Sequence, residues 1–190
     1  MRRDDEHQAG FTLVELLLVL FLVGIMANIV IPILRPEGFQ MNSALVEVGS
    51  TMAAQQRNAV LRQHDVVLAF DTAQRRIRVH EDLDNDGEMD SGERTSIMQL
   101  QEGVMFGRGG TPARAISSSD LSLTQQQDGI PSLTFHSNGS ASERAIIYLT
   151  SERASMEDNF PEDGRALEIE RATGRVRCFS FDPGHWRERC

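Results

Sequence analysis

The chain contains no lysine, so all 19 of its basic residues are arginines. This absence excludes chemistry that runs through a lysine Schiff base. The 28 acidic residues outnumber the arginines and give a net charge of −9. Such a balance argues against a general nucleic-acid coat, because binding to phosphates requires positively charged faces.

Recognisable catalytic motifs are also missing. The five histidines are scattered along the sequence, without an HExxH motif, a nucleophile elbow or a CxxC pair, at His7, His64, His80, His136 and His185. No nucleophile and base share a recognisable spacing. We therefore expect a chain without an active site, and not an enzyme.

Cysteine is scarce. The two cysteines, Cys178 and Cys190, both lie near the C-terminus. In a chain that leaves the cytosol, two thiols at this spacing predict a disulfide. Closing so short a loop would stabilise the fold by roughly 3 kcal/mol if the bridge is unstrained. The alternative is a pair of free thiols.

Much of the apolar content lies in one run, from Phe11 to Leu34. As a helix, its 24 residues would span roughly 36 Å, enough to cross a hydrocarbon core of ~30 Å. The run is longer than the apolar part of an ordinary secretory signal, and no small-x-small site follows it. Arg2 and Arg3 precede it, so the positive-inside rule keeps residues 1–10 cytoplasmic and sends the C-terminus across the membrane.

Glu15 is the one carboxylate within this run. A charge inside a membrane-spanning segment costs on the order of 3 kcal/mol, so it marks a functional site that needs a partner. Cleavage after Gly10 would give Phe11 a free amine. The amine of a neighbouring subunit would then neutralise Glu15 and set the stagger of the packed helices. The alternative is a glutamate at the membrane edge that is simply hydrated.

The sequence Gly10-Phe11-Thr12-Leu13-Val14-Glu15 resembles the cleavage and methylation motif of type IV prepilins and type II secretion pseudopilins. The resemblance implies that a prepilin peptidase of the inner membrane cuts after Gly10 and methylates Phe11. It also implies assembly with other pilins or pseudopilins through the N-terminal helix, with Glu15 at the family's acidic position. Neither a catalytic residue nor a required cofactor is implied for the subunit itself.

Gly24 and Pro32 match helix-weakening positions of the same family. Proline removes one helical hydrogen bond and clashes one turn back, and glycine costs ~1 kcal/mol relative to alanine. The resemblance implies that the segment between them stretches or unwinds in a filament. The alternative is a mild kink without a role.

A second helical segment is expected at residues 35–63. An apolar stripe recurs there at helical spacing, formed by Met41, Leu45, Val48, Met52 and Ala59. This stripe should pack on a sheet, with the methionines in the core. Residues 56–62 resemble the corresponding helix end in the GspH/FimT subgroup of minor pilins.

Residues 64–190 show the two-residue period of strands. Residues 65–70 and 75–80 are expected to form a hairpin, and later strands are expected at 96–100, 132–136, 145–150, 166–171 and 175–181. Residues 107–131 and 151–164 are predicted to be exposed loops. The pattern predicts an α+β class, with the helix packed on an antiparallel β-sheet or small β-sandwich. The resemblance implies a pilin fold with a periplasmic β-domain.

Residues 82–93 (DLDNDGEMDSGE) match the D-x-[DN]-x-[DN]-G-x5-E pattern of a calcium loop. Oxygen ligands for Ca²⁺ would come from Asp82, Asp84, Asp86, Glu88, Asp90 and Glu93. The expected flanks are strands, unlike the helices of an EF-hand. The alternative is an acidic hairpin loop without a metal, which also occurs in GspH/FimT-like pilins.

Two functions are open at this point. The first is a structural minor pseudopilin of the GspH type in a type II secretion filament, or a subunit of a type IV pilus. The second is a DNA-binding minor pilin of the FimT type in natural transformation, since Gly174-Arg175-Val176-Arg177 resembles that group's GRxR motif. Arg187 and Arg189 lie nearby, and arginines bind phosphates. The alternative for these arginines is pairing with neighbouring acidic residues.

Overall fold

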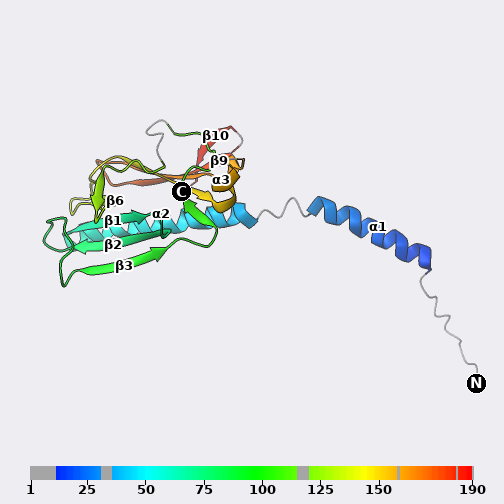
Figure 1. Cartoon of the computed structure of the whole chain (residues 1–190), viewed down its shortest axis with the longest axis horizontal. Coiled ribbons are helices and arrows are strands. Elements are labelled where there is room, and N and C mark those ends of the chain that lie inside the picture. The colour runs from blue at the N-terminus through cyan, green and yellow to red at the C-terminus, as the bar shows by residue number, and fades with distance from the viewer. Residues whose placement is uncertain (1–11, 31–35, 115–119, 158, 183, 190) are drawn as a thin grey trace, which may run out of the picture. The chain divides into compact units, whose positions relative to one another are not determined.

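The computed structural model describes residues 12–30, 36–114, 120–157, 159–182 and 184–189, with the backbone alone for residues 27–30 and 36. The chain divides into two compact units, Met1–Pro36 and Glu37–Cys190, which we describe separately. In the first unit the described residues form one helix, α1 (Leu13–Val30; Figure 1).

The second unit begins along the helix α2 (Pro36–Arg62). Proline is well placed at the first position of a helix, because its missing N–H has no helical partner there. One face of α2 is buried at the expected spacing, and Met41, Leu45, Val48 and Met52 are at most 2% exposed. The predicted apolar stripe is therefore the buried face of this helix.

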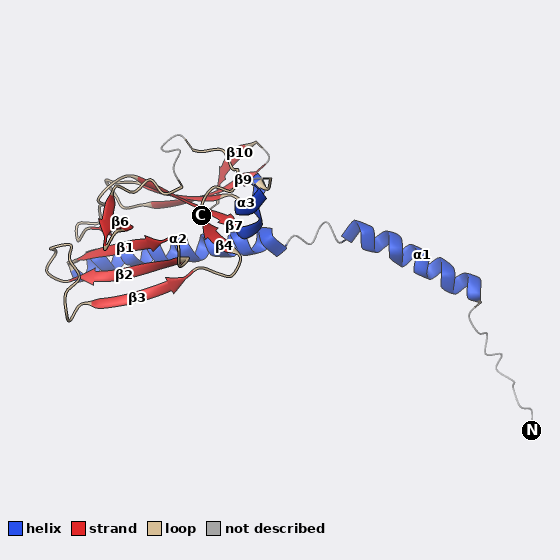
Figure 2. Ribbon diagram, viewed as in Figure 1, coloured by secondary structure: helices blue, strands red, loops and turns tan. Residues whose placement is uncertain are grey.

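In the described part of the chain, ten strands follow, arranged in two antiparallel sheets (Figure 2). Sheet A has the order β3-β2-β1-β6-β5, and sheet B has the order β10-β9-β8-β7-β4. The strands of sheet A are β1 (Asp65–Asp71), β2 (Arg76–Asp82), β3 (Arg94–Gln99), β5 (Gln125–Gln127) and β6 (Ile130–Phe135). The strands of sheet B are β4 (Val104–Phe106), β7 (Ala145–Ser151), β8 (Arg165–Ile169), β9 (Val176–Asp182) and β10 (His185–Glu188). A short helix, α3 (Glu152–Glu157), and a 3-10 turn, Pro161–Asp163, lie between β7 and β8.

One hydrophobic core joins α2 to the inner faces of both sheets. It contains Leu45 and Met52 from α2, Phe70 from sheet A and Leu149 and Leu167 from sheet B, all at most 2% exposed. A smaller cluster lies on the other face of sheet B. The predicted α+β class, with a helix packed on antiparallel sheets, is confirmed.

The two predicted loops contain more structure than the sequence pattern indicated. Strand β5 lies within residues 107–131, and α3 lies within residues 151–164. Thr111 and Asp163 in these segments are buried. The prediction of uniformly exposed loops was therefore wrong, because β5 pairs with the next strand, β6, and Thr111 donates to the carbonyl of Pro161 (3.2 Å).

Candidate functional site

The helix α1 presents apolar side chains on all its sides. From Leu13 to Met26 its large apolar residues are 44–77% exposed. A helix that is apolar all round needs apolar surroundings, which are lipid tails or other apolar helices. Within its own unit, α1 therefore leaves these apolar side chains uncovered.

Glu15 lies in the first turn of α1 and takes part in a capping box. Its backbone N–H donates to Thr12 Oγ1 (3.3 Å), and its carboxylate accepts from the backbone N–H of Thr12 (3.5 Å). Reciprocal bonds of this kind satisfy two N–H groups that a helix end leaves without partners. The Thr-x-x-Glu spacing was visible in the sequence as a capping signal, and our sequence analysis did not use it.

Several predicted residues of the processing and assembly site lie outside the described residues. These are Gly10, Phe11 and Pro32. Gly24 lies within α1, where an added Cβ would meet nothing within 4 Å. The roles of these residues in cleavage, methylation and assembly stay predictions.

By length and hydropathy, none of the helices in the described part of the chain qualifies as a membrane span. The predicted span, residues 11–34, extends beyond α1 at both ends into residues 11 and 31–34, which lie outside the described part.

The acidic loop after β2 brings three of its six predicted calcium ligands together. Carboxylate oxygens of Asp82, Asp84 and Asp86 all lie within 4.8 Å of one another. Asp82 is buried at the end of β2, and its two oxygens accept from the backbone N–H groups of Asp86 (3.2 Å) and Gly87 (2.8 Å). Gly87 has a φ of +82°, which suits glycine at the sharp turn.

The other three predicted ligands, Glu88, Asp90 and Glu93, are not part of this cluster among the described residues. Glu93 faces the protein, where one oxygen accepts from the backbone N–H of Leu83 (2.8 Å) and the other from that of Asp90 (2.9 Å). It also contacts Nε2 of His80. In this geometry Glu93 closes the loop, and only the three clustered aspartates fit a cation. Binding of Ca²⁺ stays a prediction.

The surroundings of Glu93 stabilise its charged form. The bond from the N–H of Asp90, then the contact with His80 and the bond from Leu83, lower the pKa of Glu93 to about 2. His80 is fully buried, and its Nδ1 lies 2.9 Å from Nε2 of Gln127 in β5. The local motif contains no signal for this arrangement, because Gln127 is remote in sequence.

The arginines of the predicted DNA site are largely paired with acids. Arg177 binds Glu188 with two hydrogen bonds of 3.1 and 2.6 Å. This bond raises the pKa of Arg177 and lowers the pKa of Glu188. Arg175 is exposed. Glu188 lies near Arg177 because β10 pairs with β9, in a register that places Glu188 opposite Phe179 on the same strand as Arg177.

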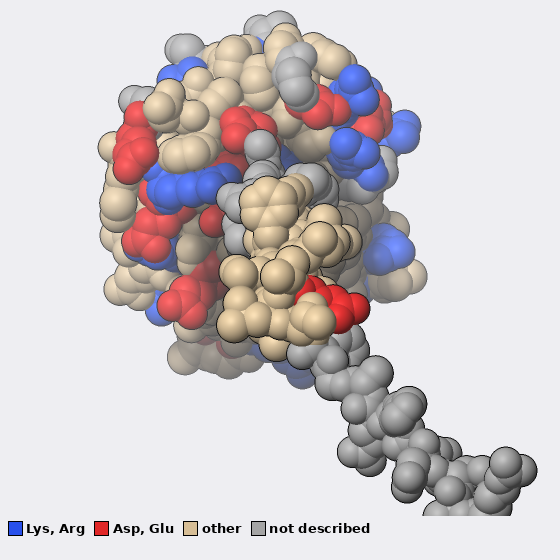
Figure 3. All heavy atoms as spheres, turned by 90° about the vertical axis from the view of Figure 1, so that its right-hand side faces the viewer, with Lys and Arg blue, Asp and Glu red and all other residues tan. Residues whose placement is uncertain are grey.

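Arg187 and Arg189 share one acidic neighbour. Arg187 lies 3.1 Å from Asp182, and Arg189 lies 3.9 Å from the same carboxylate oxygen. Arginine and acidic side chains are also interspersed on the face of the globular unit turned to the viewer in Figure 3. A site for phosphates needs arginines that are not already neutralised, so the arrangement does not favour one here.

Gly174, the glycine of the same motif, has a packing reason of its own. Its φ is +62°, and an added Cβ would lie 2.4 Å from the carbonyl oxygen of Gly139 and 2.9 Å from Cγ of Gln56. Gln56 of α2 donates to that same carbonyl at 3.1 Å. The turn at Gly174 therefore approaches α2 too closely for any side chain.

Cys178 is buried and disulfide-bonded. The other cysteine of the chain, Cys190, lies outside the described residues. The pairing Cys178–Cys190 thus stays a prediction. The backbone N–H of Arg189 donates to the carbonyl of Cys178 (2.8 Å), which places the C-terminal segment beside this cysteine.

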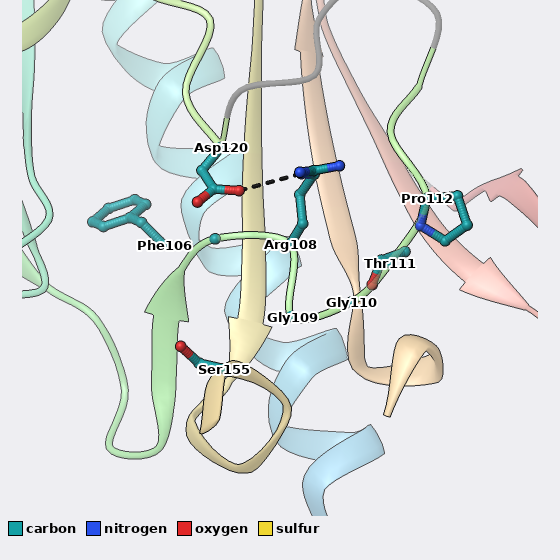
Figure 4. A pocket seen from close by; sticks show the side chains of 9 residues that line it. Phe106, Arg108, Gly109, Gly110, Thr111, Pro112, Asp120 and Ser155 are labelled. Carbon is teal, nitrogen blue, oxygen red and sulfur yellow. Dashed lines mark hydrogen bonds and ion pairs between the residues drawn. The ribbon is translucent and has the colours of Figure 1, made fainter. Parts of the chain in front are cut away.

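A pocket of about 500 Å³ lies beside the end of β4 (Figure 4). It is lined by residues 106–112 together with Asp120 and Ser155. Figure 4 shows Arg108 and Asp120 pointing toward each other, and Arg108 Nε donates to Asp120 at 3.3 Å. This pair neutralises the two charged residues of the described lining, so the pocket has no net charge to attract an ionic ligand.

Residues 6–27 match the family model described as the prokaryotic N-terminal methylation motif. No curated protein sequence matches the chain. Among solved structures, the minor pseudopilin EpsH from the type 2 secretion system of Vibrio cholerae is 15% identical, with a TM-score of 0.51. The match covers 77% of this chain and 99% of that one.

Two further structures give lower scores. A crystal structure of EpsH from Vibrio cholerae is 13% identical over 73% of this chain and 92% of that one, with a TM-score of 0.46. The type IV minor pilin FimU of Pseudomonas aeruginosa is 12% identical, with a TM-score of 0.49, and the match covers 77% of this chain and 92% of that one. The chain thus carries a prepilin-type methylation motif and has the pilin-like fold that the sequence resemblance predicted.

Proposed function

We propose that this chain is a structural minor pseudopilin of a type II secretion filament. In this proposal a prepilin peptidase cuts after Gly10 and methylates Phe11, and the mature subunit joins other pseudopilins through its N-terminal helix. The β-domain lies in the periplasm and serves in assembly, without an active site.

The observation that carries the proposal is the surface of α1. Its large apolar residues are exposed on all sides of the helix, and they lie within residues 6–27, which match the methylation motif. Burial of apolar surface contributes a free energy of roughly 25 cal/mol per Å². The large exposed apolar area of α1 therefore strongly favours association with lipid or with other helices. We infer that residues 11–34 first lie in the inner membrane as a single pass and later in the core of the filament.

Glu15 would have two roles in such a filament. Within its own helix it caps the first turn through Thr12. A carboxylate has several acceptor sites, so it can also bind the amine of Phe11 on a neighbouring subunit. The second bond would neutralise a charge that is costly in apolar surroundings.

The test is processing of the full chain, expressed with and without an active prepilin peptidase. We expect the wild-type protein to lose its first ten residues and to gain one methyl group on Phe11 only when the peptidase is active. Gly10→Val should block both changes, since a bulky side chain does not fit where the family requires glycine.

Gly24→Ala is the matched control, because it changes a glycine of the same segment away from the cleavage site. It should be processed like the wild type. Mature protein that still carries residues 1–10 in cells with a working peptidase would contradict the proposal. Intact mass and N-terminal sequencing distinguish these outcomes.

A further inference from the structure

The strand β3 forms a long edge of sheet A. It has six residues and pairs with β2 alone, whereas the other edge strands, β4, β5 and β10, have three, three and four residues. Five of its six residues are exposed, and Ile97 is 58% exposed. Among the described edges, β3 is therefore the one that offers most unpaired backbone.

The register shows which backbone groups of β3 point away from the sheet. Arg76 pairs with Gln99 in an antiparallel register, and the N–H of Leu100 donates to the carbonyl of Arg75 (2.9 Å). In such a ladder, hydrogen-bonded pairs alternate with non-bonded ones. Ser96 and Met98 therefore bond to β2, and the N–H and C=O groups of three residues point outward: Thr95, Ile97 and Gln99.

Natural edge strands usually carry a device that prevents pairing with other chains, such as proline, a bulge or inward-pointing charges. β3 contains no proline, its register with β2 is regular over six pairs, and its one charged residue is Arg94 at its start. The N–H and C=O groups of an extended backbone are best complemented by another extended backbone. We propose that the outer edge of β3 binds an extended, basic segment of another polypeptide, which adds to sheet A as a further strand.

The acidic charge beside β3 favours a basic partner segment. The loop that leads into β3 exposes Asp84, Glu88 and Asp90, against the single cation Arg94 on the strand. A basic residue at the end of the incoming strand would meet these carboxylates, and an apolar residue at its centre would cover Ile97. A second copy of this chain fits less well, because two chains of net charge −9 repel each other. The inference rests on the edge of β3 and is independent of processing at Gly10.

The test uses the full chain in detergent micelles and a short synthetic peptide of alternating valine and threonine with an arginine at each end. Amide hydrogen exchange is followed residue by residue. The peptide should slow exchange at Thr95, Ile97 and Gln99 by at least about tenfold, because these N–H groups gain partners. Ser96 and Met98 should not change, since they already bond to β2.

Two controls separate backbone pairing from side-chain effects. Ile97→Pro removes the central outward N–H without touching the bonds to β2, and it should abolish the protection. Ile97→Thr keeps that N–H and should weaken binding only severalfold. The same peptide with an N-methyl group on every residue has no N–H on either edge, so it tests the wild-type chain directly, and it should not bind even if Ile97→Pro fails to fold.

Three results would overturn the proposal. The first is absence of protection with saturating peptide, and the second is equal protection by the N-methylated peptide. The third is protection that appears without peptide as the protein concentration rises, which would make a second copy the occupant. A peptide with glutamate in place of arginine should bind at least about tenfold more weakly. Equal affinity of the two peptides would contradict the proposal that the partner segment is basic.

Discussion

The two helices of this chain differ in where their apolar side chains find contacts. In α1 the apolar residues point in all directions and are exposed, whereas in α2 they form one stripe buried against two sheets. The difference shows that α2 belongs to the core of the globular unit, whereas the described part of the first unit leaves the apolar surface of α1 uncovered.

The largest stability effect is expected in the buried stripe of α2. Met52→Ala should lower the free energy of unfolding by about 2–5 kcal/mol, because Met52 is fully buried and its loss leaves a cavity. Leu17→Ala in α1, at a position that is 59% exposed, should leave unfolding of the globular unit unchanged. Chemical denaturation of the full chain in detergent, followed by Trp186 fluorescence, measures both.

Val46→Ala is the matched control within α2. Val46 is 59% exposed, so its truncation should change the stability by no more than about 0.5 kcal/mol. Equal losses of unfolding free energy for Met52→Ala and Val46→Ala would show that the buried stripe of α2 does not stabilise the fold. A large loss of unfolding free energy for Leu17→Ala would show that α1 contributes to the stability of the globular unit.

A smaller loss is expected where a turn approaches α2. Gly174→Ala should destabilise the protein by about 2–3 kcal/mol, because it combines a positive φ with a Cβ placed 2.4 Å from the oxygen of Gly139. Gly129→Ala is the control, since its φ of +75° is similar but an added Cβ meets nothing within 4 Å. It should cost about 1 kcal/mol. The same loss for both variants would mean that backbone strain alone matters at Gly174.

The acidic loop predicts a dependence of stability on pH. Folding lowers the pKa of Glu93 from 4.5 to about 2. A carboxylate with a lowered pKa contributes stability above its unfolded pKa and loses that contribution as the pH falls through its folded pKa. Stability should therefore decrease between about pH 4.5 and about pH 2, and Glu93→Gln should flatten this decrease. Thermal unfolding as a function of pH measures it.

Glu88→Gln is the control for the loop, because Glu88 is exposed and lies outside the cluster. It should keep the acid dependence of the wild type. An unchanged pH profile in Glu93→Gln would mean that the bonds of Glu93 to Leu83 and Asp90 do not stabilise the folded state.

The smallest expected effect is on DNA binding, which the alternative function requires. We expect no retention of duplex DNA by the full chain at low salt, because Arg177, Arg187 and Arg189 lie beside acidic partners. An electrophoretic mobility shift at low ionic strength checks this. Retention that is lost when Arg175→Ala and Arg177→Ala are combined would instead support the FimT-type alternative.

Periodicity predicted the parts of the fold whose contacts are local or repeated. The stripe of α2 and the hairpin of β1 and β2 were visible, because each shows a regular alternation of apolar and polar residues. Strand β5 was missed, since Gln125–Gln127 has no strand pattern and exists only through pairing with β6. The helix α3 was missed because only six residues form it between two buried strands.

In the candidate site, too, some features could be predicted from the sequence and others depend on the fold. Of the residues in the calcium pattern, Asp82, Asp84 and Asp86 lie close together in sequence, and their carboxylate oxygens also lie close together in the structure. Glu93 of the same pattern lies outside this cluster, and its carboxylate contacts His80 in β2. The pattern of Arg175 and Arg177 indicated a cationic site, and pairing with Glu188 changed its electrostatics.

The sequence by itself determined the methylation motif, the apolar character of α1 on all sides and the buried stripe of α2, because these depend on neighbours along the chain. Only the tertiary structure decided that Glu93 faces His80, that Arg177 binds Glu188 and that no described strand pairs with the outer edge of β3. The reason is physical. Helix periodicity arises from residues three and four apart, whereas an ion pair or a free strand edge depends on which distant segments the fold brings together.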